Sequence, residues 1–146
     1  FMFSGYLTVS PTKELHYILV ESQDKFNRDP LLVWMNGGPG CSSMLGMFME
    51  NGPCVFDDGN YTIFNNPYPW NNRTNVLFLE APAGVGYSFA QTSADTQFND
   101  IISSKDNLEA LHSFFKKFPE FVGRDVYLSG ESYAGIYIPY FAMQIH

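Results

Sequence analysis

The stretch DVYLSGESYAG, residues 125–135, decides the fold expected for this chain. It begins as a short apolar strand, passes through a turn of small residues and leads into a helical stretch that reaches residue 146. A serine on such a sharp strand-to-helix turn projects its hydroxyl into solvent, and its neighbours are small because the turn packs backbone against backbone. Ser132 is therefore the candidate nucleophile, although Ala134 replaces the second glycine of the usual Gly-x-Ser-x-Gly pattern. The alternative is a plain glycine and serine turn.

Two earlier apolar runs resemble the one before Ser132. Residues 31–35 (LLVWM) lead into the loop NGGPG at 36–40, and residues 75–80 (NVLFLE) lead into a second loop, APAGVG. Both runs predict fully buried strands. Residues 98–118 place apolar side chains close to a 3.6-residue repeat and predict the strongest helix, which Pro119 ends.

The rest of the chain completes an α/β pattern. Pro139 is expected to kink or restart the last helix, because it has no N–H to donate. Residues 3–9 and 14–21 are expected to form a hairpin of two strands. Residues 41–50 are expected to form a helix, and residues 54–74 an irregular segment. Buried strands that alternate with helices predict one α/β domain with a mostly parallel central sheet and an antiparallel N-terminal hairpin.

Composition excludes several classes of protein. The 146 residues carry 8 Lys+Arg against 15 Asp+Glu, a net charge of −7, and the basic residues are scattered, which argues against nucleic acid as a partner. A hydrophobic content of 45%, with 17% aromatic residues, is too high for a disordered chain. The apolar runs are far shorter than the roughly 20 residues that span a bilayer, so no membrane span is expected.

A serine needs help to act as a nucleophile. It requires an adjacent base and N–H donors for the oxyanion that forms during acyl transfer. On a strand-to-helix elbow, one donor is the N–H of the residue after the nucleophile, here Tyr133, and the other comes from a loop after an earlier strand. The glycine-rich loop 36–40 stands in the expected chain order. A phosphate cradle is a weak alternative, because no lysine lies near this loop.

Three segments together resemble one family. They are WMNGGPGCSS at 34–43, APAGVGYS at 81–88 and GESYAG at 130–135, and they resemble the signature segments of the serine carboxypeptidases, the group of cathepsin A and yeast carboxypeptidase Y. The resemblance extends across essentially the whole chain. It departs from the family at Met35, where leucine is usual, and at Ile136, where relatives often have histidine.

This resemblance implies an α/β-hydrolase fold and an enzyme that removes single residues from the C-termini of peptides and proteins at acidic pH. It implies a protein of the secretory pathway that works in lysosomes, in vacuoles or outside the cell, without a cofactor or metal. Ser132 would be the nucleophile, and the N–H groups of Gly38 and Tyr133 would form the oxyanion hole. The residues implied to hold the terminal carboxylate of the substrate are Asn36, Gly37, Glu50 and Glu131.

The two glutamates in this set have a testable physical logic. Two carboxyls that share a site cannot both ionise cheaply, so one pKa rises and the protonated form can donate to a substrate carboxylate. Glu131 lies inside the elbow. Glu50 lies near a predicted helix end, where the sequence alone favours an ordinary exposed glutamate.

Cysteines and glycosylation motifs add weaker signals. Asn60 and Asn72 each begin an Asn-x-Thr acceptor motif in loop-like sequence, which favours a secretory route. In the family that the chain resembles, Cys41 pairs with a cysteine far downstream. No such partner is present here, so a bridge from Cys41 to Cys54 is disfavoured and the role of Cys54 is open.

The acid and the base of a catalytic triad are missing from the sequence. In α/β-hydrolases they follow the serine, but here no Asp or Glu follows Ser132, and the only later histidine is His146. Fourteen residues of helix would carry that ring about 20 Å away, too far to serve as the base. His16 and His112 are expected to be structural or surface residues. The chain is thus predicted to be the N-terminal part of one serine carboxypeptidase domain, inactive alone and with an open sheet edge.

Two other functions fit the same motifs. The elbow and the glycine loop would serve an acyltransferase or an esterase as well as a peptidase. A non-catalytic binding module with this fold is the alternative from a different class. The complete nucleophile motif favours an enzyme, and the pair of Asn36 with Glu131 favours recognition of a carboxylate.

Overall fold

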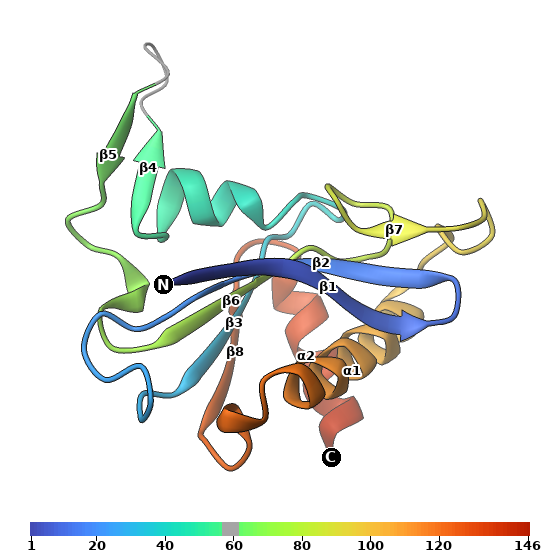
Figure 1. Ribbon diagram of the computed structural model, residues 1–146. Helices are drawn as coiled ribbons and strands as arrows, with labels where there is room; N and C mark the ends of the chain where they lie inside the picture. Colours follow the sequence, from blue (N-terminus) through green and yellow to red (C-terminus); the bar gives the residue numbers. More distant parts are fainter. Residues whose placement is uncertain (57–61) are drawn as a thin grey trace.

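Strand β3 (Leu31–Met35) lies inside a mixed sheet, between two other strands, in the computed structural model, which describes residues 1–56 and 62–146 (Figure 1). The strands of this sheet follow the order β1-β2-β6-β3-β8, and the short strand β7 pairs with β2. Their bounds are β1 Met2–Ser10, β2 Lys13–Val20, β6 Asn75–Leu79, β7 Phe89–Ala90 and β8 Val126–Gly130. The predicted α/β architecture, with an antiparallel N-terminal hairpin and mostly parallel central strands, is confirmed.

The parallel strands bring two loops to one edge of the sheet. Strand β3 pairs in parallel with β6 on one side and with β8 on the other, and Met35 faces Gly130 at the end of the second ladder. The carboxyl ends of parallel strands meet at the same edge. The loop that follows β3 and the turn that follows β8 are therefore neighbours, although about 95 residues separate them in the sequence.

Both faces of the sheet are covered, which explains why its central strands are apolar throughout. Helices α1 (Asp100–Lys117) and α2 (Ala134–Ile145) lie on one face, where Leu77 and Leu79 belong to the same buried cluster as Phe114 and Phe141 (Figure 1). On the other face a smaller cluster forms around β6 and β3. Its buried members are Val20, Trp34, Met47, Val76 and Phe78. The alternation along β6 assigns each side chain to one of the two cores.

The predicted long helix is confirmed as α1, and its ends have clear causes. The side chain of Asn99 caps its start by accepting a hydrogen bond of 2.9 Å from the N–H of Ile102. Lys116 and Lys117 occupy its last turn, where positive charge interacts favourably with the helix dipole. Pro119 then begins a short 3-10 turn, η3 (Pro119–Phe121).

The segment around residues 41–50 differs from the predicted helix. Helical turns begin only near residue 44 and continue as a π-helix, η1 (Gly46–Glu50), in which the N–H of Asn51 bonds to the carbonyl of Gly46 at 2.9 Å. Close packing on the sheet constrains this element, because a Cβ at Gly46 would lie 2.1 Å from the indole nitrogen of Trp34. Glu50 is the last residue of this element.

The irregular segment expected at residues 54–74 was wrong. The segment 54–74 contains a hairpin of β4 (Cys54–Phe56) and β5 (Ile63–Asn65) and a 3-10 turn, η2 (Trp70–Asn72). The strands have three residues each and are mostly exposed, so they lack a buried face that would give an alternating pattern. Helix α2 runs from Ala134 to Ile145 with Pro139 inside it, so of the two expected effects of this proline the restart does not occur, and the kink stays a prediction.

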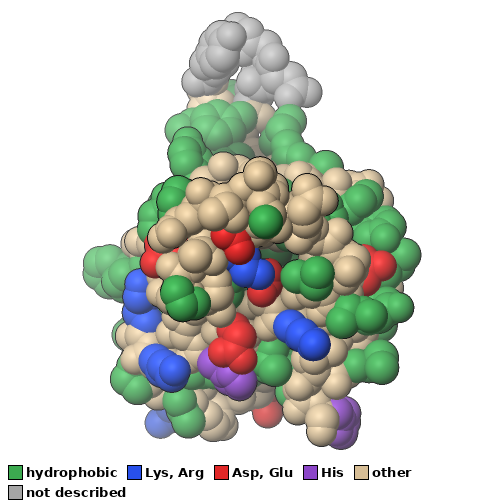
Figure 2. Space-filling model, turned by 90° about the vertical axis from the view of Figure 1, so that its right-hand side faces the viewer, with side chains coloured by type: hydrophobic (Ala, Val, Ile, Leu, Met, Phe, Trp, Pro, Cys, Tyr) green, Lys and Arg blue, Asp and Glu red, His purple; other side chains and the backbone are tan. Residues whose placement is uncertain are grey.

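Charged side chains are interspersed over the surface. Figure 2 shows acidic and basic groups side by side at the end of the molecule that carries the β1–β2 turn and β7. Lys13 on β2 forms an ion pair with Asp106 on α1 there, with Nζ 2.5 Å from Oδ2. No helix within the described residues is long and apolar enough to cross a membrane. Strand β8 pairs only with β3 within the described ranges and forms one edge of the sheet, as the sequence predicted.

Candidate active site

Ser132 occupies a strained turn between β8 and α2. Its φ of 54° lies in the left-handed region, and it is the one non-glycine residue of the described ranges with a positive φ. Strain of this kind persists where the surrounding structure enforces it, and it is typical of nucleophile turns. The Ser132 side chain is exposed to solvent. The predicted nucleophile therefore has the backbone geometry that the motif requires.

The small residues around Ser132 have different degrees of constraint. A Cβ at Gly130 would lie 2.2 Å from the carbonyl oxygen of Met35 and 2.7 Å from Cβ of Ala134, so only glycine fits there. A Cβ at Gly135 would meet no atom of the described chain within 4 Å. Ala134 is fully buried. The alanine that departs from the usual pattern is therefore accommodated, because the tight contact is made by the glycine that precedes the serine.

The loop after β3, residues 36–41, packs directly on this turn and is called the oxyanion loop below. A Cβ at Gly37 would lie 2.5 Å from the backbone nitrogen of Tyr133 and 2.8 Å from the carbonyl oxygen of Glu131. The loop closes with a hydrogen bond of 3.0 Å from the N–H of Cys41 to the carbonyl of Gly37. Its backbone at Gly38 has a φ of 115°, a conformation that favours glycine.

The two N–H groups predicted for the oxyanion hole are thus brought to the same place. Tyr133 N lies against Gly37, the neighbour of Gly38. Neither the N–H of Gly38 nor that of Tyr133 donates to another atom within residues 1–56 and 62–146. Gly38 is exposed and Tyr133 is half-buried, so both N–H groups are free to donate to the oxygen of a ligand or of water. This arrangement suits an oxyanion.

Asn36 connects the oxyanion loop to the elbow. Its side-chain amide donates to Oε1 of Glu131 at 3.2 Å. Its amide oxygen accepts from the indole N–H of Trp34 at 2.8 Å and from the N–H of Gly46 at 3.1 Å, so the orientation of the amide is fixed by its donors. The side chain is 2% exposed. Asn36 thus presents its N–H₂ group to the carboxylate cluster and cannot rotate without losing two hydrogen bonds.

Glu50 completes the cluster. Partial burial of its carboxyl raises its pKa above the ordinary value, the negative charge of Glu131 raises it further, and a hydrogen bond with Asn36 acts in the opposite direction. Glu50 and Glu131 both remain accessible to solvent. Two carboxyls and an amide therefore share one site next to Ser132, and the environment of Glu50 favours its protonated form.

The remaining predicted residues lie outside this cluster. Asn72 is exposed in η2, and Asn60 lies outside the described residues. Cys41 is an exposed free thiol at the end of the oxyanion loop, and the free thiol of Cys54 is half-buried. The isolated histidines differ: His112 is exposed on α1, 3.7 Å from Glu109, whereas His16 is buried.

Sequence reasoning missed a buried network that holds the other end of the oxyanion loop. Glu80, at the end of β6, is 0% exposed and accepts hydrogen bonds from the N–H of Tyr87 at 2.9 Å and from the hydroxyl of Ser42. Nδ1 of His16 lies 2.9 Å from the same carboxylate, and Nε2 of that ring lies 3.0 Å from the hydroxyl of Ser4. The signal in the sequence was a glutamate that ends an otherwise apolar strand.

We expect Gly37→Ala to disrupt the site without removing any chemical group from it. The new methyl group would overlap the backbone of Tyr133 and push the oxyanion loop away from the elbow, so kcat of the full-length protein should fall about a hundredfold. Steady-state kinetics would measure the loss. Gly135→Ala is the matched control, because its methyl group meets nothing within the described chain, and its kcat should stay within about twofold of the unmodified protein. Equal activities of the two variants would contradict the packing argument.

The class of this protein follows from the fold and the site. A strained serine turn at the carboxyl ends of the parallel strands of a mixed sheet, faced by a glycine-rich loop, defines an α/β-hydrolase. The family model described as serine carboxypeptidase (Peptidase_S10) matches residues 1–146. The chain belongs to the serine carboxypeptidase family.

Individual relatives agree with this assignment. Serine carboxypeptidase ctsa-4.1 of Caenorhabditis elegans is 50% identical over 145 residues, which cover 99% of this chain and 31% of the relative. Lysosomal protective protein of Mus musculus is 46% identical over 143 residues, or 98% of this chain and 30% of the relative. A crystal structure of Kex1(delta)p, a prohormone-processing carboxypeptidase of Saccharomyces cerevisiae, superposes with a TM-score of 0.87 at 32% identity and covers 99% of this chain and 33% of that one. The chain thus spans about a third of the length of these relatives.

Proposed function

We propose that this chain is the N-terminal part of a serine carboxypeptidase that releases single C-terminal amino acids from peptides and proteins at acidic pH. The observation that carries the proposal is the cluster of Asn36, Glu131 and Glu50 beside Ser132. An esterase or acyltransferase needs the serine and the oxyanion donors, but a protonated carboxyl and an amide N–H₂ group side by side suit a ligand that ends in a free carboxylate.

The proposed reaction begins with attack of the Ser132 hydroxyl on the carbonyl of the last peptide bond. A base takes the serine proton, and the N–H groups of Gly38 and Tyr133 stabilise the oxyanion of the tetrahedral intermediate. The C–N bond then breaks, the amino acid leaves with a proton from the same base, and an acyl-enzyme remains on Ser132. Water hydrolyses that ester by the reverse sequence of proton transfers. The base and its acidic partner are proposed to lie in sequence beyond this chain, by analogy with relatives three times as long.

Several properties of the whole protein belong to the same proposal. Lysosomal, vacuolar or extracellular placement is supported by the lysosomal name of one relative and by the exposure of Asn72. A glycan at Asn72 would be detected as a mass shift that enzymatic deglycosylation and Asn72→Gln both remove. A disulfide from Cys41 to a cysteine beyond this chain is supported by the exposure of its thiol, and mass spectrometry without reduction would find the linked peptides.

The first experiment compares two substrates with the full-length protein. A blocked dipeptide should release its C-terminal amino acid, whereas transfer of an acyl group from an activated ester to an alcohol should be much slower. The reverse ranking would identify an acyltransferase or an esterase. Failure of a fluorophosphonate to label Ser132 in the folded protein would instead favour the non-catalytic binding module.

The shared carboxyl site predicts that substrate binding weakens as pH rises. The pKa of Glu50 is raised by burial and by the charge of Glu131, so its carboxyl keeps its proton to a higher pH than an ordinary glutamate does and can then donate to the substrate carboxylate. Above that pKa Glu50 loses its proton, and two negatively charged carboxylates of the protein then face the negatively charged carboxylate of the substrate. KM should then rise by up to about tenfold per pH unit, because one proton is linked to binding. The measurement is KM between about pH 5 and pH 8 for a peptide with a free C-terminus.

Two controls make this pH dependence specific. A peptide ester of the same sequence lacks the terminal carboxylate, so its KM should change little over the same range. Glu50→Gln keeps a donor at all pH values and should flatten the KM profile of the acid substrate. A flat KM profile for the unmodified protein with the acid substrate would show that no shared proton contributes to binding.

A further inference from the structure

Tyr137 reaches from the helix behind the nucleophile to the oxyanion loop. It lies on α2, five residues after Ser132, and its hydroxyl accepts a hydrogen bond of 3.2 Å from the N–H of Gly40. The side chain is 3% exposed. This contact joins the loop that carries one predicted oxyanion donor to the helix whose first residues follow the other donor.

The oxyanion loop has few anchors of its own in this region. Gly38 and Gly40 both have positive φ, 115° and 87°, and neither carries a side chain that could hold the loop in place. Asn36, the first residue of the loop, donates its N–H to the hydroxyl of Ser43, two residues beyond the end of the loop, and that hydroxyl donates to the carbonyl of Leu79 in the sheet. Between these two points, the bond from Gly40 N–H to Tyr137 is the polar contact that fixes the loop relative to α2.

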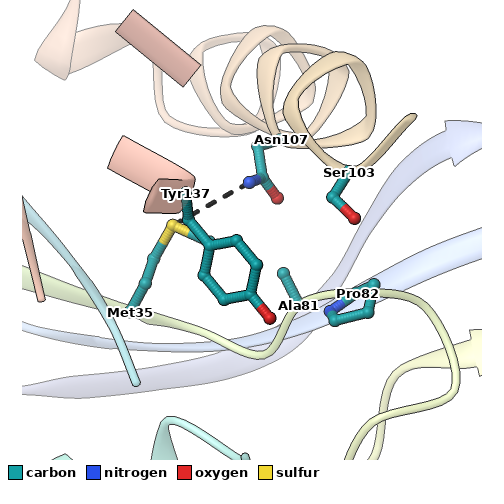
Figure 3. A pocket seen from close by; sticks show the side chains of 6 residues that line it. All are labelled: Met35, Ala81, Pro82, Ser103, Asn107 and Tyr137. Carbon is teal, nitrogen blue, oxygen red and sulfur yellow. Dashed lines mark hydrogen bonds between the residues drawn. The ribbon is translucent and has the colours of Figure 1, made fainter. Parts of the chain in front are cut away.

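The environment of Tyr137 holds its ring in one position. Figure 3 shows the ring beside Met35 at the end of β3 and pointing towards Ala81 and Pro82, in a narrow pocket lined also by Ser103 and Asn107 of α1. The space left in this pocket admits no water molecule. On another side, the ring packs edge-on against that of Tyr133, with centroids 5.2 Å apart. A ring enclosed in this way keeps its hydroxyl at a fixed point.

A second tyrosine extends the same arrangement to the nucleophile turn. The hydroxyl of Tyr133 donates to Asp100 at the start of α1, at 3.3 Å from Oδ1. Burial raises the pKa of Tyr137, which favours the neutral hydroxyl. Each predicted oxyanion donor is thus associated with one ring of a packed tyrosine pair: Tyr133 supplies its own N–H, and Tyr137 contacts the loop that contains Gly38.

We propose that Tyr137 is a positioning residue of the oxyanion hole, which holds the loop of Gly38 at the correct distance from Ser132 through the N–H of Gly40. This inference rests on the proposed role of Gly38 and Tyr133 as oxyanion donors. Tyr137 does not touch the substrate. Its loss therefore affects stabilisation of the tetrahedral intermediate, and it leaves recognition of the terminal carboxylate intact.

The test is Tyr137→Phe in the full-length protein, which removes the acceptor and keeps the ring in its pocket. We expect kcat for a blocked dipeptide to fall about tenfold while KM stays within about twofold. The rate of labelling of Ser132 by a fluorophosphonate should fall by a similar factor, because that reaction also places an oxygen in the oxyanion hole. Tyr140→Phe is the matched control, since Tyr140 is 37% exposed on the same helix, and it should leave both rates unchanged.

The outcomes separate this inference from the proposed function. Unchanged kcat and an unchanged labelling rate in Tyr137→Phe would overturn the inference. A fall in kcat together with an equal rise in KM and a lower thermal midpoint would also overturn it, because these changes indicate that the whole structure is destabilised. If the unmodified protein labels at Ser132 but releases no amino acid, the proposed peptidase function fails, and the labelling rates of the two variants still decide the role of Tyr137. Absence of labelling in the unmodified protein overturns both.

Discussion

Ser132→Ala is expected to lower kcat of the full-length protein for a blocked dipeptide by at least about 10⁴-fold. Without the hydroxyl no acyl-enzyme can form, and only the oxyanion donors and the binding site remain to assist attack by water. KM should change little, because the carboxylate cluster of Asn36, Glu50 and Glu131 is untouched. Release of the free amino acid, quantified by mass spectrometry at high enzyme concentration, would measure the residual rate.

The control for this loss is Ser93→Ala. Ser93 is exposed in the segment between β7 and α1, and its replacement should leave kcat within about twofold of the unmodified protein. The Ser132→Ala protein should also lose its reaction with a fluorophosphonate. Residual activity above about one per cent of the unmodified rate would assign the nucleophile to another residue.

Glu80→Ala should lower the free energy of unfolding by about 3–5 kcal/mol. The carboxylate is completely buried, and its removal leaves His16, the hydroxyl of Ser42 and the N–H of Tyr87 without their common acceptor. It also leaves a cavity beside Gly86, where a Cβ would lie 2.0 Å from Oε1 of Glu80. Urea unfolding monitored by tryptophan fluorescence would measure the loss.

Glu109→Ala provides the comparison on an exposed site. Glu109 is more than half exposed on α1 and faces only His112 at 3.7 Å, so the change should alter the free energy of unfolding by no more than about 0.5 kcal/mol. Glu80→Gln keeps one acceptor oxygen and should fall between the two. If Glu80→Ala were as mild as Glu109→Ala, the network around Glu80 would not be a stabilising element of the fold.

Local patterns in the sequence predicted the frame of the site. The apolar runs at β3, β6 and β8 are short, continuous and bounded by glycine or proline, so their type follows from residues within each run. The position of Ser132 follows in the same way, because a strand, a turn of small residues and a helix succeed one another within about twenty residues. The contact of Asn36 with Glu131 was expected from a resemblance and appears as a hydrogen bond of 3.2 Å.

Other features depend on contacts that no local pattern reveals. His16 and Glu80 are 64 residues apart, and Gly40 and Tyr137 are 97 residues apart, so each pair exists only because the sheet brings separate strands together. Glu50 looked like an ordinary exposed glutamate, yet at the end of η1 it interacts with Asn36 and Glu131, which lie 14 and 81 residues away in the sequence. The short strands β4 and β5 pair with each other, but they bury too few side chains to require an alternation of apolar and polar residues in their sequences.

The packing of Gly37 on the elbow also bears on how this protein can tolerate mutation. Both oxyanion donors are main-chain groups, so no amino-acid replacement deletes them, and selection can protect them only through the residues that shape the backbone. Inactivating variants should accordingly be frequent at glycines without reactive atoms, such as Gly37 and Gly130, where any side chain collides with neighbouring backbone. A saturation screen that scored activity would outline the oxyanion loop by its intolerant glycines, whereas Gly135 would accept small residues.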